Sequence, residues 1–389
     1  MADRDPIRIC QVCAVEFTYR TFLSPLAEVL SGNGYQLHAA FTADAPGLQQ
    51  LGSVRIHPVV IARSPSPLAL VRSTVGLWHL FRTEHFTLVH VHTPVAAIAA
   101  RLAACLARTP IVLYTAHGFY FHDGMVWPLR WAHIALEWLL APLATELLTV
   151  SAEDATLARR LRFKAASRIH AIGNGVDTQR FVPAEVSDRL RCRERFGLHS
   201  EAVVIGIVAR QVSEKGYLEL FAAFEQLAAA DLRVQLLICG SRLPSDHAGS
   251  IEAPLSALQQ AWPARVVDAG QLVDVEAAYQ AMDVFCLPSW REGLPCTVIE
   301  ALCCGLPVVA TAIRGCRELV VPDLTGVLVP PRDSTALAAA LRRLIADASL
   351  RQQVGQAGRV RALARYDQRQ VLAHQVRLYQ AALARARIA

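Results

Sequence analysis

The chain has 389 residues, of which 53% are hydrophobic and 19% charged, a composition too apolar for a disordered protein and a length too great for one ordinary core. We therefore expect two domains of roughly 150–200 residues each. The formal net charge of +6 comes from 39 basic and 33 acidic side chains without a long run of one sign, which argues against a dedicated nucleic-acid binder. Only two basic residues are lysines, Lys164 and Lys215, so a functional lysine has few candidates.

Short β-rich apolar runs alternate with helical segments along most of the chain, the pattern of α/β domains with parallel sheets. In the first half the predicted strands are 7–12, 36–41, 55–60, 88–92, 111–115, 147–150 and 168–172, with helices such as 21–30 and 96–106. The second series has predicted strands at 203–209, 234–239, 265–268, 284–288 and 307–311. The simplest interpretation is two tandem Rossmann-like domains.

The domain boundaries follow from the turn residues. We expect a first domain over 1–173, an interdomain linker region over 174–200, where turn residues interrupt the periodicity, and a second domain over 201–365. The Arg- and Ala-rich end of the chain is helical and no strand follows it, so 366–389 is predicted to be a helix that packs back on the first domain.

The segment 125–149 raises the question of a membrane. It contains Trp127, Trp131 and Trp138, but charged residues and Pro142 interrupt it, so a helix that spans a bilayer is excluded. A buried amphipathic helix is the first interpretation and a shallow interfacial contact is the second. The three tryptophans are accordingly either core residues or membrane-facing ones.

The ten cysteines are expected to act as small buried hydrophobic residues, because a chain of this size can build its own core. Cys10 and Cys13 have CxxC spacing but lie in a predicted strand, and no second such pair completes a zinc site. The first residues lack the basic and apolar leader of a signal peptide. We expect a reduced, cytoplasmic setting.

The strongest chemical signal is the run from Arg291 to Glu300, directly after a predicted strand. Glu292 lies in a loop and Glu300 about one turn into the following helix, so both carboxylates could face one ligand. A tight loop at a helix N-terminus presents free N–H groups, which suits a diphosphate. A solvated pair of glutamates is the alternative, but the position at the carboxyl end of a strand favours a site.

A second signal is the polar loop that follows the strand 203–209 and contains Arg210 and Lys215. Two cations at this edge of the sheet could neutralise a nucleotide diphosphate and its leaving charge. Surface residues that pair with local acids such as Glu214 are the alternative. The glutamate pair in the same domain favours the functional interpretation.

A third signal is His117, which follows a strand of the first domain and precedes Gly118, so that its ring could enter a cleft. His90 and His92 alternate along a strand and are interpreted as structural or cleft-lining residues. Weaker candidates for acceptor contact are His122, Asp123 and Arg130.

With these motifs the sequence resembles the family 4 retaining glycosyltransferases of GT-B fold. The resemblance covers nearly the whole chain and is carried by the residues just described together with Asn174-Gly-Val-Asp177…Phe181, Thr115-Ala-His-Gly118 and Arg314-Gly-Cys-Arg-Glu318. It implies two Rossmann-like domains that face each other across a cleft, with a nucleotide-sugar, usually a UDP- or GDP-sugar, bound between them. It also implies that neither a metal ion nor a cofactor is required.

The resemblance assigns roles to particular residues. Glu300 would hold the ribose hydroxyls, Glu292 would contact the donor sugar, and Arg210 and Lys215 would bind the diphosphate. His117 would touch the donor sugar from the acceptor domain. The remaining expected substrate-binding residues are Gly118, Gly293, Leu294, Pro295, Cys296 and Thr297. Attack on the front face, with the leaving phosphate assisting deprotonation of the acceptor, needs neither Glu292 nor His117 as a nucleophile.

The segment 14–22 lacks the pair of glycines that many family members have after the first strand, and this puts a close backbone approach to the donor phosphates there in doubt. The segment Phe22-Leu-Ser-Pro-Leu-Ala27, together with the run His117-Gly-Phe-Tyr-Phe-His122, is similar to the bacterial surface-polysaccharide subgroup. That similarity implies transfer of a hexose or N-acetylhexosamine, from a UDP-sugar by family frequency, to a glycan on polyprenyl diphosphate. The enzyme would be cytoplasmic and in peripheral contact with the inner membrane face.

Three alternatives to this function are compatible with parts of the sequence. A metal-dependent GT-A enzyme is disfavoured, because the Asp-x-Asp motif occurs only at Asp3–Asp5, near the terminus. A non-hydrolysing UDP-sugar 2-epimerase has a similar architecture. The third is a non-catalytic nucleotide-sugar-binding partner in a polysaccharide assembly complex.

Overall fold

The computed structural model describes residues 6–44, 47–62, 66–122, 124–243, 246 and 248–386. Asp3, Asp5 and Asp123 lie outside these residues. The chain divides into two compact units, one formed by 1–173 with 371–389 and the other by 174–370.

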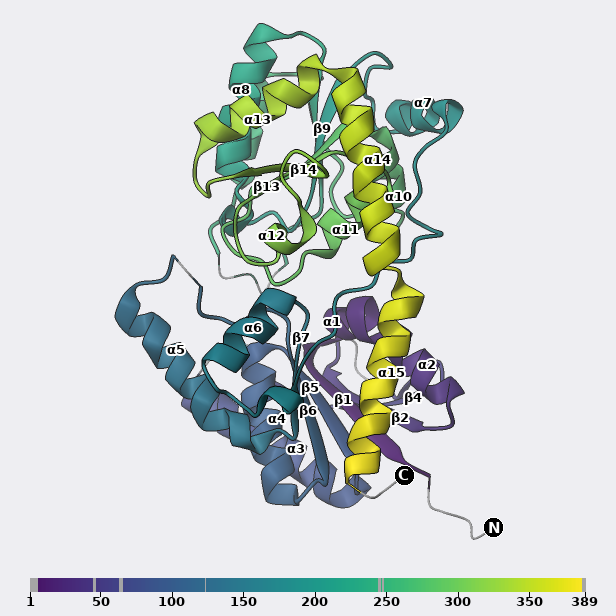
Figure 1. Ribbon diagram of the computed structural model, residues 1–389, viewed down its shortest axis with the longest axis vertical. Coiled ribbons are helices and arrows are strands. Elements are labelled where there is room, and N and C mark those ends of the chain that lie inside the picture. Colours follow the sequence, from purple (N-terminus) through teal and green to yellow (C-terminus); the bar gives the residue numbers. More distant parts are fainter. Residues whose placement is uncertain are drawn as a thin grey trace. The chain divides into compact units, whose positions relative to one another are not determined.

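The first unit is an α/β layer structure around one sheet (Figure 1). Its strands are β1 Arg8–Val15, β2 Gln36–Thr42, β3 Gln50–Leu51, β4 Val54–Pro58, β5 Leu88–His92, β6 Ile111–Ala116, β7 Glu146–Thr149 and β8 Ile169–Ala171. Its helices are α1 Glu16–Thr18, the π-helix η1 Tyr19–Leu23, α2 Ser24–Gly32, α3 Pro67–Glu84, α4 Pro94–Ala107, α5 Trp127–Leu140, α6 Ala152–Arg160 and α15 Gln368–Arg385, with short 3-10 turns η2 Ala141–Leu143 and η3 Ala166–Arg168.

The strand order of the first sheet is β3-β4-β2-β1-β5-β6-β7-β8, and among the described strands all pairs except β3 with β4 are parallel. The chain winds outward from β1 in one direction and from β5 in the other, so the order reverses between these two strands. The strands are short apolar runs because both faces of the sheet are covered. On one face, six alanines of α4 are buried in the core, and their small side chains suit a close approach of the helix to the sheet.

The second unit contains a six-stranded parallel sheet with helices on both sides (Figure 1). The strands are β9 Val203–Val208, β10 Val234–Cys239, β11 Val266–Asp268, β12 Val284–Leu287, β13 Val308–Thr311 and β14 Gly326–Val329. The helices are α7 Val186–Arg195, the 3-10 turn η4 Ser213–Lys215, α8 Tyr217–Ala230, α9 Glu252–Ala261, α10 Glu276–Ala281, α11 Cys296–Cys303, α12 Cys316–Leu319, α13 Ser334–Ala346 and α14 Ala348–Arg365. The order β11-β10-β9-β12-β13-β14 reverses between β9 and β12.

The predicted strands all exist: 88–92 and 234–239 coincide with β5 and β10, and the ends of the others differ by at most three residues. Two strands, β3 and β14, are additional to the prediction. The segment 174–200, expected as a linker, belongs to the second unit and contains the helix α7. The helix predicted over 366–389 corresponds to α15, which begins at Gln368 after α14 has ended at Arg365.

The last helix, α15, packs back on the first unit, as predicted. Tyr379 is fully buried there and its hydroxyl hydrogen bonds to the ring of His90 on β5. At the far end of α15, Arg385 forms an ion pair of 2.6 Å with Glu146 at the start of β7.

The interpretation of 125–149 as a buried amphipathic helix is wrong. Only 127–140 form the helix α5, and the chain continues into the strand β7. Trp127, Trp131 and Trp138 are 72%, 49% and 62% exposed, so they are not core residues. The prediction for the cysteines fares better, because all ten are free thiols and seven of them are buried.

Two glycines of the second unit permit contacts that a side chain would block. Gly216, at φ +77°, lies so close to the carbonyl of Pro288 that an added Cβ would come within 2.0 Å of its oxygen. Gly197 has a similar φ of +67°, but no atom lies within 4 Å of an added Cβ there. An alanine at Gly197 would therefore strain only the backbone, whereas an alanine at Gly216 would strain the backbone and also clash with Pro288.

We predict that Gly216→Ala lowers the free energy of unfolding by at least ~1 kcal/mol more than Gly197→Ala does, because both changes strain a positive φ but only the first adds a clash with backbone. Urea denaturation of the two variants measures this difference. Equal losses would show that the loop carrying Gly216 can move away from Pro288 without cost.

Candidate functional site

Three loops meet at the carboxyl edge of the second sheet, around the point where the strand order reverses. The loop after β9 touches the end of β12 through Gly216, and the N–H of Trp290 donates to the carbonyl of Glu214 at 2.9 Å. The loop after β13 approaches in the same way, since a Cβ on Gly315 would lie 2.1 Å from the carbonyl oxygen of Gly293. In open parallel sheets, ligands bind at such a reversal. The predicted cations and carboxylates of this domain lie on these loops or on the helix that follows.

Lys215 and Glu292 form the central ion pair. The ammonium Nζ of Lys215 lies 2.6 Å from Oε1 of Glu292, and the hydroxyl of Ser289 donates to the same oxygen at 2.7 Å. The two charged side chains are only 15% and 11% exposed. Glu292 is therefore held in place by two donors from two different loops.

Arg210 lies on the same edge of the second sheet, but it forms ion pairs with carboxylates other than Glu292. Its guanidinium pairs with Asp246 and, at 3.3 Å, with Glu214. The side chain remains 40% exposed. The sequence left open the alternative that Arg210 pairs with Glu214, and this ion pair is present in the structure. Arg210 nevertheless lies in the same loop as Lys215.

Glu300 lies one turn into α11, as predicted, and is held by a residue that the sequence did not single out. The hydroxyl of Tyr279, on α10, donates to Oε2 of Glu300 at 2.5 Å. Burial raises the pKa of Glu300, and the Tyr279 hydrogen bond and the nearby charge of Arg180 oppose that rise. The position of Tyr279 depends on the packing of α10 beside α11, for which no local sequence motif exists.

The predicted Asn174…Phe181 motif has a structural role at this site. The amide of Asn174 donates to the carbonyl of Leu294 at 2.6 Å, which fixes the loop before α11. The ring of Phe181 meets Tyr279 edge to face, with centroids 5.7 Å apart. The motif therefore positions both the loop and the tyrosine that holds Glu300.

The N-terminus of α11 is open to a ligand. Pro295 precedes the helix and no side chain caps it. Leu294 is buried and its carbonyl is occupied by Asn174, whereas Cys296 and Thr297 are half-buried in the first turn. First-turn N–H groups and the positive end of the helix dipole favour an anion.

His117 lies in the first unit, at the end of β6. Its Nε2 is 3.0 Å from Nδ1 of His92, at the end of β5, and burial lowers the pKa of His117 to about 4. The ring is therefore neutral near pH 7. His90 is buried between Tyr379 and Thr115, which agrees with a structural role. Gly118 follows at φ +110°, a conformation that favours glycine.

The weaker candidates are spread over the same unit. His122 is half-buried beyond β6, and Arg130 is half-buried on α5.

Among the described residues, one group has the composition of a metal site. His38, His57 and Glu84 offer ligand atoms within 4.8 Å of one another. However, the carboxylate of Glu84 already pairs with Arg8 and Arg55, whose charges oppose a cation. The group belongs to the first unit and shares no residue with the site in the second.

The comparisons with known proteins cover both halves of the chain. Residues 188–361 match the family "Glycosyl transferases group 1", and residues 21–180 match "Glycosyltransferase Family 4". The putative glycosyltransferase EpsD of Bacillus subtilis is 30% identical over 90% of this chain and 91% of its own length. The chain therefore belongs to glycosyltransferase family 4 and is a glycosyltransferase.

A second relative is UDP-Gal:alpha-D-GlcNAc-diphosphoundecaprenol alpha-1,3-galactosyltransferase of Escherichia coli, which is 28% identical over 74% of this chain and 73% of its own length. Among solved structures, sucrose-phosphate synthase of Thermosynechococcus elongatus superimposes with a TM-score of 0.80 over 97% of this chain and 99% of that one, at 21% identity. These two chains share a fold, the GT-B arrangement of tandem Rossmann-like domains.

We predict that Tyr279→Phe shifts the acidic limit of nucleotide binding to higher pH. In the role expected from the sequence, the charged carboxylate of Glu300 accepts hydrogen bonds from ribose hydroxyls, so nucleotide binding is expected to be lost as the pH falls through the raised pKa of this residue. The hydrogen bond from the Tyr279 hydroxyl lowers the pKa of Glu300. Removal of this hydroxyl is therefore expected to raise the pKa of Glu300 further. Titration of UDP affinity against pH measures the shift, with Tyr366→Phe, a buried tyrosine of the same unit, as the control. Coincident profiles for Tyr279→Phe and the native chain would contradict the assignment.

Proposed function

We propose that the chain transfers a hexose or N-acetylhexosamine from a UDP-sugar to a glycan carried on polyprenyl diphosphate, with retention of configuration and without a metal ion. The observation that carries this proposal is the Lys215–Glu292 pair at the sheet edge, with Glu300 and the open N-terminus of α11 on the same edge. A cation, an anion-binding helix end and an acceptor for hydroxyl groups are what a nucleoside diphosphate needs.

In this proposal the second unit binds the donor. The diphosphate takes the ammonium of Lys215 away from Glu292, which leaves the carboxylate to accept hydrogen bonds from sugar hydroxyls. Arg210 exchanges Glu214 for a phosphate oxygen in the same manner. The first-turn N–H groups of Cys296 and Thr297 add fixed donors, and Glu300 accepts from the ribose.

The retaining step needs no nucleophile from the chain. As the bond between the anomeric carbon and the phosphate breaks, negative charge develops on the leaving phosphate, where Lys215 stabilises it. The acceptor hydroxyl attacks the same face and passes its proton to that phosphate. His117, neutral near pH 7 because burial lowers its pKa to about 4, serves the sugar as a hydrogen-bonding partner and not as a charged acid.

The donor base and the acceptor are proposed by analogy. The name of the E. coli relative states a UDP-galactose donor and an acceptor on diphosphoundecaprenol, and the sequence resembles the surface-polysaccharide subgroup. We therefore place this chain in the assembly of an exopolysaccharide, capsule or O-antigen at the cytoplasmic face of a membrane. The family assignment disfavours the 2-epimerase alternative, and the variants below test the non-catalytic one.

UDP and UDP-sugars are expected to raise the melting temperature of the protein more than GDP, ADP or their sugars do, because a ligand that binds only the native state stabilises it. EDTA is expected to leave that shift unchanged. Differential scanning fluorimetry across this panel provides the measurement. A preference for GDP would correct the base, and a shift abolished by EDTA would overturn metal independence.

Lys215→Met is expected to reduce kcat by about 10²–10³, since a fixed cation at a developing phosphate charge contributes a few kcal/mol to the transition state. The matched control is Lys164→Met, which removes the other lysine of the chain, one that donates to the carbonyl of Ala141 in the first unit. Released UDP in the presence of acceptor is the readout. Equal turnover in both variants would contradict the role of Lys215, and no turnover in the native chain with any acceptor would favour a non-catalytic partner.

A further inference from the structure

The helix α5 buries Ile134 and Leu140, as a surface helix does, but its exposed side is apolar as well. Of its 14 residues, all of them described, the side chains that are exposed are apolar. The large ones, together with the preceding valine, are Val126, Trp127, Leu129, Trp131, Leu136, Trp138 and Leu139, each between 39% and 72% exposed. The three titratable side chains of the helix, Arg130, His133 and Glu137, are only partly exposed and lie on the opposite stripe.

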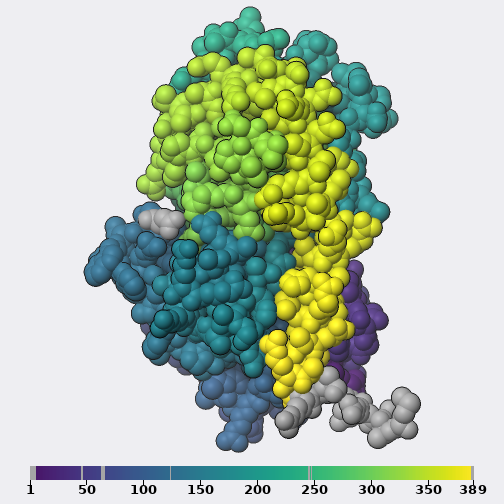
Figure 2. Space-filling view, in the orientation of Figure 1, coloured from purple at the N-terminus to yellow at the C-terminus, as the bar shows by residue number. Residues whose placement is uncertain are grey.

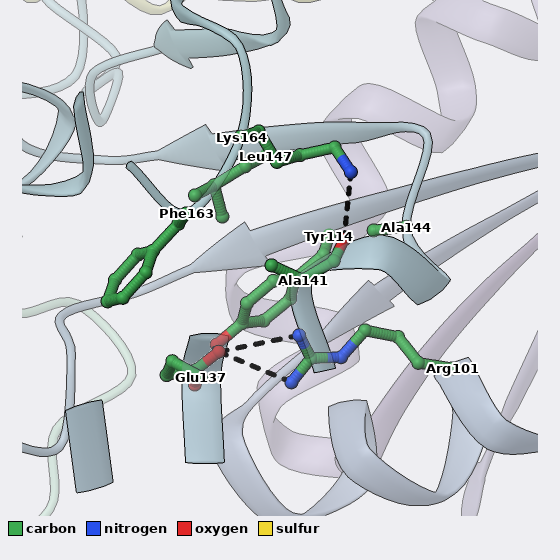
Figure 3. Close-up of a pocket in the computed structure, with 8 residues that line it drawn as sticks. All are labelled: Arg101, Tyr114, Glu137, Ala141, Ala144, Leu147, Phe163 and Lys164. Carbon is green, nitrogen blue, oxygen red and sulfur yellow. Dashed lines mark hydrogen bonds and ion pairs between the residues drawn. The ribbon is translucent and has the colours of Figure 1, made fainter. Parts of the chain in front are cut away.

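A buried cation holds the helix in this orientation. Arg101 on α4 is fully buried and its guanidinium lies 3.4 Å from the carboxylate of Glu137 and 4.1 Å from the ring of Tyr114. The hydroxyl of Tyr114 donates to the other oxygen of Glu137 at 3.0 Å. Figure 3 shows Arg101 and Tyr114 converging on Glu137 from beneath the helix. Rotation of α5 that buried its tryptophans would leave the charge of Arg101 buried and unpaired, which is strongly unfavourable.

The polar contacts of Glu137 with Arg101 and Tyr114 therefore keep the apolar face of α5 exposed. This part of the chain lies at the surface of the first unit in Figure 2, in blue. An exposed apolar patch of this kind marks a binding surface, because single exposed hydrophobic residues are common but contiguous ones are not. Tryptophan is the residue that prefers the boundary between water and lipid headgroups.

Basic residues follow next to the end of α5. Lys164 donates to the carbonyl of Ala141, directly after the helix, at 2.8 Å. The segment 155–168 contains four arginines and this lysine without any acidic residue, and Arg160 and Arg162 are exposed. An apolar aromatic face with a neighbouring cationic segment complements a surface of anionic lipid headgroups.

The length of α5 agrees with a position along a bilayer surface and not across it. Fourteen residues span about 21 Å, less than the ~30 Å of a hydrocarbon core. No helix among the described residues is long and apolar enough to cross a membrane.

We propose that α5 lies in the headgroup region of an anionic membrane, with its tryptophan face inserted and the exposed Arg160 and Arg162 against the lipid phosphates. This inference deepens the proposed function, because it names the lipid surface on which a polyprenyl-linked acceptor would be met. The binding itself requires neither donor nor acceptor.

The test is co-flotation of the full chain with vesicles of phosphatidylethanolamine and phosphatidylglycerol, and with vesicles of phosphatidylcholine alone. The native chain is expected to float with the anionic vesicles. Trp131→Ser with Trp138→Ser is expected to lower the vesicle partition coefficient roughly tenfold or more. Arg160→Gln with Arg162→Gln is expected to lower it less, and to remove most of its dependence on salt.

The matched control is Leu232→Ser with Val273→Ser, two apolar side chains of the second unit that are 85% and 94% exposed. It is expected to float like the native chain. Stabilisation by UDP is measured for every variant, so that a misfolded protein is recognised and the fate of the donor site is read separately from that of the membrane surface. Quenching of tryptophan fluorescence by brominated lipid, lost in the Trp131/Trp138 variant, is the expected sign of insertion.

Two results would overturn the proposal. One is flotation of the native chain and the Trp131/Trp138 variant to the same extent. The other is absence of flotation together with concentration-dependent self-association of the native chain that the tryptophan substitutions abolish, which would identify the face as a contact between copies of this chain. Neither result would test the proposed function, which is tested separately by UDP binding and turnover.

Discussion

The candidate site of the second unit depends on the close approach of the chain to itself at two glycines. Gly216 lies against the carbonyl of Pro288 and Gly315 against that of Gly293, so the loops that follow β9, β12 and β13 touch one another directly. Only this packing brings Lys215 within 2.6 Å of Glu292 from a different strand. The ion pair and the serine that supports it therefore depend on contacts made mainly by backbone atoms.

The cations of the site are neutralised before any ligand arrives. Lys215 pairs with Glu292, and Arg210 with Asp246 and Glu214. In the proposed function a diphosphate would replace these carboxylates, so part of its attraction would be offset by the pairs that it breaks. The same exchange would release Glu292 for the sugar. Recognition of the phosphate and of the sugar would then be linked through one carboxylate.

The strands and the charged motifs could be predicted from the sequence because both are local signals. A strand such as β10 is a short, largely apolar run between polar turns, and Glu292 and Glu300 have a recognisable spacing on either side of a helix start. Tyr279 could not be predicted, since it meets Glu300 only after the sheet has set α10 beside α11. The orientation of α5 could not be predicted from the sequence for the same reason. The helical periodicity of the sequence separates the two faces of α5. Which face points inward depends on the contact of Glu137 with Arg101, which lies 36 residues away in the sequence.

The first unit is not a continuous piece of chain. Its last helix is made after the whole of the second unit, and it supplies Tyr379 to the buried ring of His90 and Arg385 to the almost fully buried Glu146. During synthesis, an N-terminal domain ordinarily folds as soon as it emerges. Here the buried ring of His90 and the carboxylate of Glu146 lack these partners until α15 has been synthesised. The first unit can therefore be completed only after the whole of the second unit has been made.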